Sequence, residues 1–413
     1  MKPISCLQYV DGKLFCENIP VSKIAAQFGT PCYLYSKKAV SRNMDTLLAA
    51  FPPEYADICY AVKANSNLSI LELISSRGMG FDIVSAGELY RLRRIGVSGS
   101  RIIFSGVGKT LDEIDWAIKA HIFSLGVESL EELAMIGKRA EAARCSVVVS
   151  LRLNLDIEAD THPGISTGTR KHKFGLDVDL LPKALEIIRA NPLLRLKGIG
   201  SHIGSQIMDP EPYIKSFRAL LETAEGLEQS GFALEFLDIG GGFGIPYDDQ
   251  SEPFRLDRLS RFLAEHRGSY RIVLEPGRFI VGPAGSLLSR VILTKTTGGR
   301  KFIVIDAGMN DMMRPALYQS RHRILPETEP GGRLIKADLV GPICESTDRF
   351  AEDIELPPLE DGSLVALADS GAYGSVLASN YNSRGRPPEI MVDGSRGTLI
   401  RKRETWEDLT SLE

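Results

Sequence analysis

The sequence predicts a (β/α)8 barrel followed by a β-rich domain, which the N-terminal segment joins. Between about residues 58 and 280, short apolar runs alternate with amphipathic helical patterns, as is typical of a parallel sheet. After residue 280 this alternation stops, and apolar runs follow one another with glycine-containing turns between them. At 413 residues the chain is also long enough for two domains. We place the barrel at residues 36–281 and the β-rich domain at residues 1–35 and 282–413.

Apolar runs supply the candidate barrel strands, and eight strand–helix units in this length favour a closed barrel over an open sheet. In order, the runs are ICYAV (58–62), FDIVS (81–85), IIFSG (102–106), IFSLGV (122–127), SVVVSLRLN (146–154), LKGIGSH (196–202), LEFLDIG (234–240) and RIVLEP (271–276). Helical patterns lie between them at 86–96, 110–120, 129–143 and 213–231. Thr110 with Glu113, and Ser129 with Glu132, each predict a capping box at a helix start.

The remainder of the chain predicts strands and turns. The apolar runs after residue 280 lie at 286–296, 301–308, 333–341, 363–374 and 389–402. The N-terminal residues also suggest strands, with one short helix in VSKIAAQFG (21–29), and we expect them to join the β-rich domain. The connection at 155–180 is long, which usually marks a functional or interface loop.

Composition excludes several classes of protein. A formal net charge of −4, with no basic run, argues against nucleic-acid binding. No segment is apolar for long enough to span a membrane or to serve as a signal peptide. The six cysteines form no CxxC pair, which predicts reduced thiols in a cytoplasm and no metal site.

Lys63 stands where the first barrel strand would meet a polar turn, in ICYAVKAN. A lysine that is desolvated at such a place can lose its proton and form a Schiff base with a carbonyl group. Further along, the chain offers the glycine run 240–244 and then LEPGR (274–278). A Schiff-base lysine, a phosphate cradle and a carboxylate near an arginine are the parts that a pyridoxal 5′-phosphate enzyme needs.

Several polar residues and glycines fall at predicted strand ends, where barrels of this type carry their active sites. They are Lys63, Ser85, Lys109, Arg152, Asn154, His202, Gly240, Gly241, Gly242, Glu275 and Arg278. The loops after the seventh and eighth strands are the usual phosphate site of the fold. A carboxylate such as Glu275 beside the pyridine nitrogen would keep that nitrogen protonated, which favours decarboxylation over racemisation.

Each of these residues also has a purely structural interpretation. Glu88, after Ser85, could serve only as a helix cap. His202 could be a structural hydrogen-bonding residue, and the glycine run could be only a turn. Glu275 could pair with Arg278. Cys344 could be a small buried hydrophobic residue, the usual situation of a free cysteine.

The motifs together resemble one family, the diaminopimelate decarboxylases, within the alanine-racemase-like (fold-type III) pyridoxal phosphate enzymes. The resemblance runs from about residue 30 to the C-terminus and rests on YAVKAN (60–65), GVGK (106–109), SHIGSQ (201–206), GGGFG (240–244), EPGR (275–278), AGMNDMMRPALY (307–318), GPICES (341–346), GAYG (371–374) and NYNSR (380–384). MMRPALY with GPICES, and the closing NYNSR, indicate the diaminopimelate branch.

The resemblance implies roles for individual residues. Lys63 would form the Schiff base, His202 would stack on the cofactor ring and Glu275 would meet the pyridine nitrogen. The phosphate would be held by Ser205, Gly241, Gly242 and the backbone around Gly277 and Arg278, with Tyr373 nearby. The substrate would be bound by Arg278, Arg314, Tyr318, Glu345 and Tyr373, with Glu345 at the distal ammonium and the arginines at the distal carboxylate. Cys344 would donate a proton from the partner subunit of a homodimer.

Three departures from the family pattern are small. Gly164 stands where a larger residue is expected, Ser370 replaces an alanine, and Pro283 interrupts a segment expected to be VGNAG. None of the three touches the implied chemistry, although the change at Gly164 could alter substrate access.

The implied activity is that of a carboxy-lyase, converting meso-2,6-diaminoheptanedioate (meso-diaminopimelate) to L-lysine and CO2, the last step of lysine biosynthesis. The nearest alternative is the same fold acting on ornithine, arginine, carboxynorspermidine or a specialised-metabolite amino acid. Arg278, Arg314 and Tyr318 argue for a distal carboxylate, which ornithine and arginine lack. The alternative from another class is a non-catalytic pyridoxal phosphate carrier or a regulatory homologue that has lost activity, and Lys63, Cys344 and Glu345 argue against it.

Overall fold

The structure is a computed structural model that describes residues 5–157, 173–248 and 250–413. The chain divides into two compact units. The barrel unit contains residues 44–244 and 253–277, and the β unit contains residues 2–43, 245–252 and 278–413. Helix α2 (Lys37–Ala50) runs across the division between residues 43 and 44. The domain boundaries that the sequence suggested stay a prediction.

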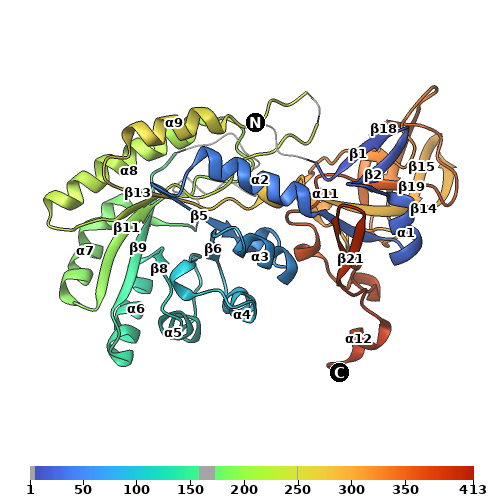
Figure 1. The fold of residues 1–413 in the computed structure, drawn as a ribbon. Coiled ribbons are helices and arrows are strands. Elements are labelled where there is room, and N and C mark those ends of the chain that lie inside the picture. The colour runs from blue at the N-terminus through green and yellow to red at the C-terminus, as the bar shows by residue number, and fades with distance from the viewer. Residues whose placement is uncertain (1–4, 158–172, 249) are drawn as a thin grey trace. The chain divides into compact units, whose positions relative to one another are not determined.

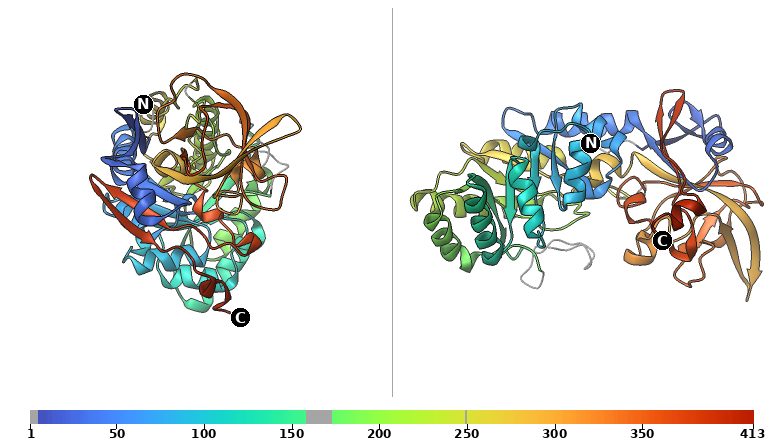
Figure 2. Two further views of the ribbon diagram at one scale, coloured as in Figure 1. Left: turned by 90° about the vertical axis from the view of Figure 1, so that its right-hand side faces the viewer. Right: turned by 90° about the horizontal axis from the view of Figure 1, so that it is seen from below.

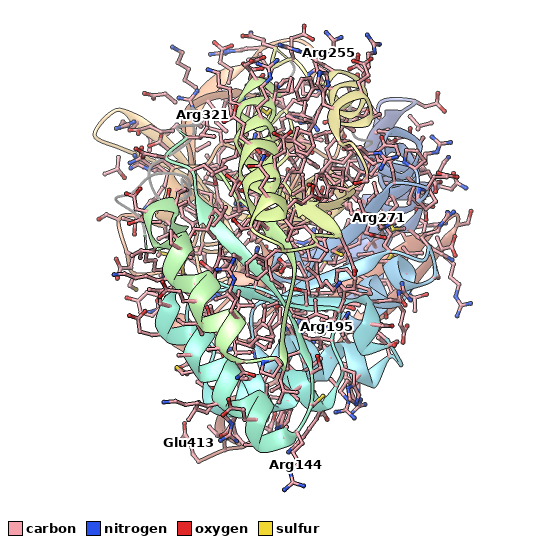
Figure 3. The ribbon with its side chains drawn as sticks, turned by 90° about the vertical axis from the view of Figure 1, so that its left-hand side faces the viewer. Arg144, Arg195, Arg255, Arg271, Arg321 and Glu413 are labelled. Atoms are coloured by element: carbon pink, nitrogen blue, oxygen red, sulfur yellow. The ribbon has the colours of Figure 1, made fainter. Side chains whose placement is uncertain are left out.

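The barrel unit is a closed sheet of eight parallel strands in the part of the chain that the structure describes (Figure 1). The strands are β5 (Ala56–Ala61), β6 (Gly80–Ile83), β7 (Ile102–Phe104), β8 (Ser124–Val127), β9 (Val147–Asn154), β11 (Leu194–Gly200), β12 (Phe236–Asp238) and β13 (Arg271–Leu274). Pairing of β13 with β5 closes the sheet. Arg271, labelled in Figure 3, reinforces that seam by donating to both carboxylate oxygens of Asp57 at 2.7 and 2.8 Å. All eight predicted strands are confirmed.

Helices connect the strands and cover the barrel (Figures 1 and 3). They are α3 (Leu68–Ser75), α4 (Ala86–Arg94), α5 (Leu111–Lys119), α6 (Leu130–Ala143), α7 (Leu181–Ala190), α8 (Glu211–Gln229) and α9 (Leu256–His266), and β10 (Leu176–Asp177) extends the sheet beside β9. The predicted capping box of Thr110 and Glu113 is present at the start of α5.

Of the two contacts in the second predicted capping box, at Ser129 and Glu132, the structure has only one. Ser129 accepts from the backbone N–H of Glu132, as the sequence suggested. The Glu132 carboxylate, however, accepts from the N–H of Glu128 and from Lys109 Nζ at 2.8 Å. Glu132 is therefore used to hold Lys109, which is buried and also donates to two backbone carbonyls. This places Lys109 in a structural ion pair rather than among the groups that face the pocket.

The β unit is built from both ends of the chain. Its main sheet has the order β18-β17-β15-β14-β4-β20-β21, and β19 pairs with β14 and β16. These strands are β4 (Cys32–Ser36), β14 (Gly285–Thr297), β15 (Arg300–Ile305), β16 (Ile324–Pro326), β17 (Ile335–Val340), β18 (Arg349–Leu356), β19 (Leu364–Leu367), β20 (Glu389–Asp393) and β21 (Arg396–Arg401). Short helices accompany them: α1 (Val21–Phe28), α10 (Arg278–Val281), α11 (Arg314–Tyr318) and α12 (Trp406–Thr410).

N-terminal residues share a hydrophobic core with the C-terminal strands. Strands β1 (Leu7–Val10), β2 (Lys13–Cys16) and β3 (Ile19–Pro20) form a small antiparallel sheet, and β4 is inserted between β14 and β20 (Figure 2). One core cluster includes Leu14 and Leu34 from the N-terminal side and Leu288 and Ile390 from the C-terminal side. The expectation that the N-terminal segment joins the β-rich domain is therefore confirmed.

Candidate active site

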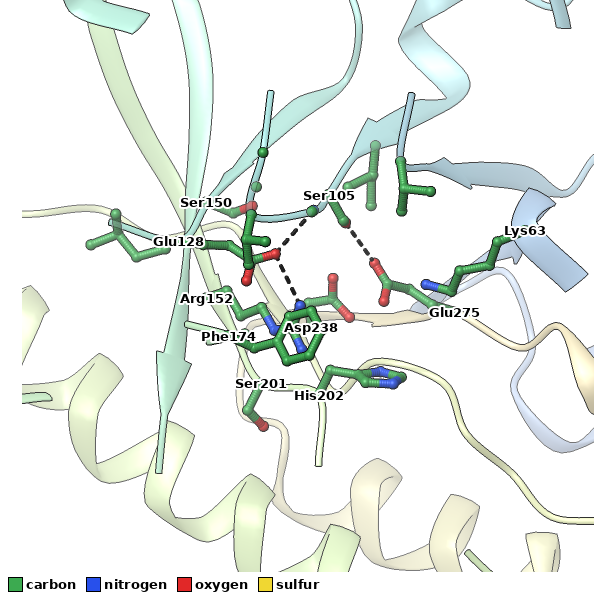
Figure 4. Close-up of a pocket in the computed structure, with 18 residues that line it drawn as sticks. Lys63, Ser105, Glu128, Ser150, Arg152, Phe174, Ser201, His202, Asp238 and Glu275 are labelled. Carbon is green, nitrogen blue, oxygen red and sulfur yellow. Dashed lines mark hydrogen bonds and ion pairs between the residues drawn. The ribbon is translucent and has the colours of Figure 1, made fainter. Parts of the chain in front are cut away.

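The C-terminal ends of the barrel strands enclose a pocket of about 430 Å³ (Figure 4). Lys63 lies just after β5, and its Nζ donates to Asp82 Oδ2 on β6 at 3.2 Å. Asp82 is fully buried, and its other oxygen, Oδ1, has no hydrogen-bond partner among the described residues. A buried carboxylate that holds one amine while a second oxygen stays unpaired is costly, which is typical of a functional site.

Glu275 reaches the same pocket from the end of β13. It is buried, and Ser105 Oγ donates to its Oε1 at 3.4 Å. Burial, together with the nearby Asp238 and Asp82 carboxylates, raises the pKa of Glu275 well above its usual range. Burial also raises the pKa of Asp238 to about 7, and the charges of the two carboxylates act on each other. At neutral pH this pair therefore keeps a proton that isolated carboxylates would lose.

His202 follows β11 and faces the pocket opposite Glu275 (Figure 4). Burial, and then the charges of Arg152 and Lys63, hold its pKa well below the usual value, so the ring is neutral. The N–H of Gly241 donates to His202 Nδ1 at 3.2 Å. Because Nδ1 accepts, the proton of the neutral ring is on Nε2. His202 thus offers a flat, uncharged aromatic face.

Arg152, at the end of β9, is bound by a carboxylate of its own. Its guanidinium donates to Glu128 Oε1 at 3.0 Å and lies 4.9 Å from the ring centre of Phe174. Glu128 also accepts from the backbone N–H groups of Gly106 and Gly175, both at 3.0 Å. These contacts fix the pocket wall at Gly106 and Gly175.

The glycine run after β12 lies against its neighbours without room for side chains. A Cβ on Gly241 would lie 1.9 Å from the carbonyl oxygen of Glu275, and one on Gly242 would lie 2.0 Å from that of Gly204. Tyr213 on α8 is buried and donates to the Gly241 carbonyl at 2.8 Å. The N–H of Ile207 donates to the Gly242 carbonyl at 3.0 Å, which places the segment containing Ser205 beside the glycine run.

Gly277 completes this edge of the barrel unit. A Cβ there would lie 2.8 Å from Ala64 Cβ and 3.2 Å from Ala61 Cβ, the residues that flank the Lys63 turn. The loop after β13 therefore packs directly on the loop that carries Lys63. All the barrel residues proposed from the sequence gather at one end of the sheet.

A second cluster lies within the β unit. Arg278 and Arg314 are both buried, and both donate to Tyr247 Oη, at 2.7 and 3.3 Å. Arg278 lies 4.9 Å from the ring centre of Tyr373, and Arg314 lies 5.9 Å from that of Tyr318. The four residues that the sequence assigned to substrate or phosphate here are thus brought together around Tyr247.

A neutral histidine supports this cluster from behind. Arg314 Nε donates to His322 Nε2 at 3.4 Å, and the ring lies across Tyr247 at 5.1 Å between centres. Burial and the two arginine charges lower the pKa of His322 to about 3. Since Nε2 accepts, Nδ1–H donates to the Ala368 carbonyl at 2.9 Å. Two guanidinium groups therefore converge on one phenol oxygen, an arrangement suited to an anion.

Cys344 and Glu345 lie apart from that cluster, on an exposed loop after β17. The N–H of Cys344 donates to Asn382 Oδ1 at 3.2 Å. Tyr381 donates to Glu345 Oε1 at 2.6 Å. The NYNSR motif thus holds the GPICES loop in place, and it leaves the Cys344 thiol exposed. The interpretation of Cys344 as a small buried residue is wrong.

Comparison with known proteins gives a consistent result. The model of the family described as "Pyridoxal-dependent decarboxylase, pyridoxal binding domain" matches residues 37–282. Diaminopimelate decarboxylase from Vibrio cholerae is 42% identical, covering 98% of this chain and 97% of that protein. The enzyme of that name from Aquifex aeolicus is 40% identical, covering 97% and 96%. The chain belongs to the diaminopimelate decarboxylase family.

A solved structure agrees with this assignment. The diaminopimelate decarboxylase of Helicobacter pylori, complexed with L-lysine, superposes with a TM-score of 0.91 at 38% identity, covering 95% of this chain and 98% of that one. The cofactor of the family is pyridoxal 5′-phosphate. The pocket fits it: an amine, a flat neutral ring, a buried proton-holding carboxyl group and a side-chain-free glycine run are all present.

The sequence missed several residues of this diaminopimelate decarboxylase site. Asp82 and Asp238 were hidden inside the apolar runs FDIVS and LEFLDIG, where a buried acid was the available signal. Tyr247 and His322 lie in irregular segments with no motif, and only tertiary structure brings them to the arginines. Gly164 of the long loop lies outside the described residues.

Proposed function

We propose that this chain decarboxylates meso-diaminopimelate to L-lysine and CO2 with pyridoxal 5′-phosphate, as the last step of lysine biosynthesis. The observation that carries the choice of substrate is the convergence of Arg278 and Arg314 on Tyr247 Oη. Two buried guanidinium groups around one hydroxyl oxygen suit a carboxylate far from the reacting carbon. The L-lysine held by the Helicobacter pylori relative is the product of this reaction.

In this proposal the barrel residues hold the cofactor. Lys63 would bind its aldehyde carbon, and His202 would lie against its ring. Ser205, Gly241, Gly242 and the backbone around Gly277 and Arg278 would receive the phosphate, with Tyr373 near it. When bound, the cofactor supplies an electron sink for the carbon that loses CO2. Glu275 would meet the pyridine nitrogen, and its raised pKa supports a proton held at that position.

Asp82 would act on Lys63. Its contact with Nζ at 3.2 Å orients the amine within the pocket. Whenever Nζ is not bound to the cofactor, the buried Asp82 carboxylate would hold it in the pocket. Lys63 can then hold a proton close to the reacting carbon without leaving the pocket.

The substrate would be recognised at its far end by residues of the β unit. Arg278, Arg314 and Tyr318 would bind the distal carboxylate, with Tyr373 beside them. Glu345 would bind the distal ammonium group. A substrate that lacks the second carboxylate would bring no anion to two buried guanidinium groups, which is the penalty that selects against ornithine and arginine.

We further propose a homodimer whose active sites are shared between subunits. Cys344 and Glu345 would enter the site of the partner chain, where the Cys344 thiol would return a proton to the carbon that has lost CO2. Their exposure on a loop held by Tyr381 and Asn382 supports this role. A site completed by a second chain makes the dimer necessary for activity.

We also propose that the protein is cytoplasmic and that the chain divides into the two domains given below. The six cysteines are all free thiols, which supports a reducing cytoplasm. In the described residues no helix has the length and apolar character to cross a membrane. Residues 36–281 would form the cofactor-binding domain, and residues 1–35 with 282–413 the β-rich domain.

The test is CO2 release by the purified protein with pyridoxal 5′-phosphate. The substrates are meso-diaminopimelate, LL-diaminopimelate, ornithine, arginine and carboxynorspermidine. We expect release from the meso isomer and formation of L-lysine. Release only from ornithine or arginine would overturn the role given to Arg278 and Arg314. Cofactor binding with no release from any of the five would overturn the proposed reaction itself.

A further inference from the structure

A basic, aromatic groove lies on the outside of the barrel, between α4 and α5. It has a volume of about 410 Å³ and is lined by Tyr90, Arg93, Arg94, Trp116 and Lys119. Tyr90 is 53% exposed and Trp116 is 45% exposed, which is unusual for two large aromatic side chains that are neighbours. The groove is separate from the catalytic pocket, because none of its residues lines that pocket.

The positive side chains of this groove are not held in ion pairs. In residues 5–157, 173–248 and 250–413, no ion pair involves Arg93, Arg94 or Lys119. Of the acidic residues on α5, Asp115 pairs with Arg139 and also lies near enough to Lys119 for their charges to interact, Glu113 caps its own helix, and Asp112 is exposed. The groove therefore combines apolar surface with three available cations, a pattern suited to an acidic, apolar partner.

The C-terminal tail of the same chain has the opposite character. It leaves the β unit at Glu404, which Arg386 and Arg401 hold. Beyond it, α12 has no buried side chain. Trp406 is 82% exposed and Leu412 is 100% exposed. With Leu409 they place an apolar residue at every third position, and Glu407, Asp408 and Glu413 supply negative charge.

The tail is ordered as a helix without the packing that a helix needs. Thr405 and Asp408 form a complete capping box at its start. A five-residue helix nevertheless gains too little from its own hydrogen bonds to be stable in water, and helices of this length depend on an apolar face packed against other surface. A capped helix with an exposed tryptophan is therefore prepared for a contact that a single chain does not provide.

We infer that the tail of one copy, residues 405–413, docks into the basic, aromatic groove of a second copy. Trp406, Leu409 and Leu412 would cover Tyr90 and Trp116, while the acidic side chains would meet Arg93, Arg94 and Lys119. Tryptophan, tyrosine and arginine are the residues that most often dominate such contacts. In a two-fold dimer the contact occurs twice, once for each tail.

A second copy is the occupant that the charges favour. Every chain carries both halves of the contact, so they are always present in equal amounts, and both halves are exposed in one chain. This inference uses the homodimer of the proposed function and adds a contact to it that lies outside the active site. A small aromatic anion in the groove would be a different occupant, and the experiments below separate the two.

The first experiment measures the dimer dissociation constant of the holoenzyme by sedimentation. Arg94→Glu and Glu407→Arg should each weaken the dimer about 10-fold or more, and the double variant should recover much of that loss. Trp406→Ala should weaken it without a charge change. Matched controls are Lys183→Glu, an exposed reversal on α7, and Glu360→Arg, an exposed reversal in the β unit, which should leave the constant unchanged.

The second experiment determines which chains are in contact. Copies with Leu412→Cys are mixed with copies carrying Trp116→Cys, all in a Cys344→Ser background, and treated with a short bis-maleimide. We expect a cross-linked dimer in the mixture and none with either copy alone. A third variant carries both Leu412→Cys and Trp116→Cys in one chain. A cross-link within that single chain, together with no cross-linked dimer from the mixture, would overturn the assignment to a second copy.

The outcomes separate this inference from the proposed function. A stable dimer whose dissociation constant is the same in all three tail and groove variants overturns the docking and leaves the decarboxylase untouched. A wild-type holoenzyme that is monomeric at assay concentration overturns both the docking and the shared active site. If the protein releases no CO2 but the tail and groove variants still raise the dimer dissociation constant as expected, only the proposed reaction is overturned.

Discussion

At the scale of single residues, Tyr247 has the most direct consequence for substrate binding. Its hydroxyl accepts from two buried guanidinium groups, and hydrogen bonds to charged groups contribute about 1.5–3 kcal/mol each. Tyr247→Phe should therefore raise KM for meso-diaminopimelate about 10-fold or more while changing kcat less. In this variant the substrate carboxylate is unchanged, but Arg278 and Arg314 lose the hydroxyl that aligns them, so they bind it less well.

Product inhibition gives this prediction a sharper measurement. L-Lysine keeps the carboxylate that was distal in the substrate, whereas cadaverine has none. Tyr247→Phe should weaken inhibition by L-lysine about as much as it raises KM, and leave inhibition by cadaverine unchanged. Tyr270→Phe is the matched control. It also removes a tyrosine hydroxyl, but this one lies just before β13 and donates to Glu228 at 2.7 Å, not to an arginine. Equal weakening of both inhibitors would contradict a role at the carboxylate.

Asp238 makes a second prediction at this scale, about pH and stability. Its native pKa is raised to about 7 by burial, so the folded state keeps a proton that the unfolded state loses near pH 4. Between these values the unfolded chain binds fewer protons, and the stability of the apoprotein should fall as pH rises. Asp238→Asn cannot ionise but keeps an oxygen to accept from the Gly240 N–H.

The measurement is the unfolding temperature of the apoprotein from pH 5 to pH 8. The slope should be smaller in Asp238→Asn than in the natural chain, while some slope remains because Glu275 shifts in the same direction. Asp112→Asn, an exposed carboxylate at the start of α5, should not change the slope. An identical slope in Asp238→Asn would mean that Asp238 is already ionised in the native state.

Sequence patterns predict residues that stand at strand ends better than those inside strands. Lys63, His202 and Glu275 stand where apolar runs stop, so their positions can be inferred from the alternation alone. Asp82 and Asp238 were not predicted, because a single acid does not interrupt an apolar run. Their importance comes from three strands meeting around one cavity, and that meeting depends on the closed sheet.

At the scale of elements, the loop after β12 depends on glycine for space. Gly241→Ala would place Cβ 1.9 Å from the Glu275 carbonyl oxygen, so backbone must move on both sides. We expect the unfolding temperature to fall by several degrees, as for other substitutions that force backbone apart, and cofactor affinity to fall about 10-fold or more. Both can be measured on one preparation, by calorimetry and by cofactor titration.

The chain offers a matched control in α8. Gly226 lies inside the helix and has no atom within 4 Å of the position that a Cβ would take, so Gly226→Ala should be neutral or slightly stabilising. Normal cofactor affinity in Gly241→Ala would show that the loop can move without disturbing the phosphate site. Equal destabilisation by both substitutions would show that close packing at Gly241 is not the cause.

Helices and strands were predictable here because their periodicity is local. The eight barrel runs and the helices between them follow from apolar spacing, and the Thr110 cap follows from four adjacent residues. In the predicted capping box at Ser129, the contact between the Glu132 side chain and the Ser129 backbone is missing, and the cause lies in tertiary structure. Glu132 gives its carboxylate to Lys109, a buried cation from the preceding βα loop, and a buried charge requires a partner more strongly than a helix end does.

At the scale of the whole molecule, the β unit joins segments that are far apart in the sequence. Strand β4 pairs with β14 and β20, and its neighbours in the core come from both ends of the chain. Composition indicated that the N-terminal residues were β-rich, but no local pattern specifies a partner strand hundreds of positions away. The same limit applies to the arginine cluster, whose members lie between residues 247 and 373.

The shared active site can be tested by mixing two inactive chains. Lys63→Ala removes the amine and Cys344→Ala removes the thiol. If each site takes Lys63 from one chain and Cys344 from the other, a mixed dimer has one intact site and one site that lacks both groups. Random exchange makes about half of the dimers mixed, so activity should approach about one quarter of the natural level.

The same mixture gives the opposite result for an unshared site. If both residues serve the site of their own chain, every site lacks one group and no activity returns. Each variant alone, taken through the same exchange, is the control, and sedimentation of differently sized tagged chains verifies that mixed dimers formed. Recovery in verified mixed dimers requires the exposed Cys344 loop to act in the partner chain, whereas its absence would return Cys344 to a structural role or to the site of its own subunit.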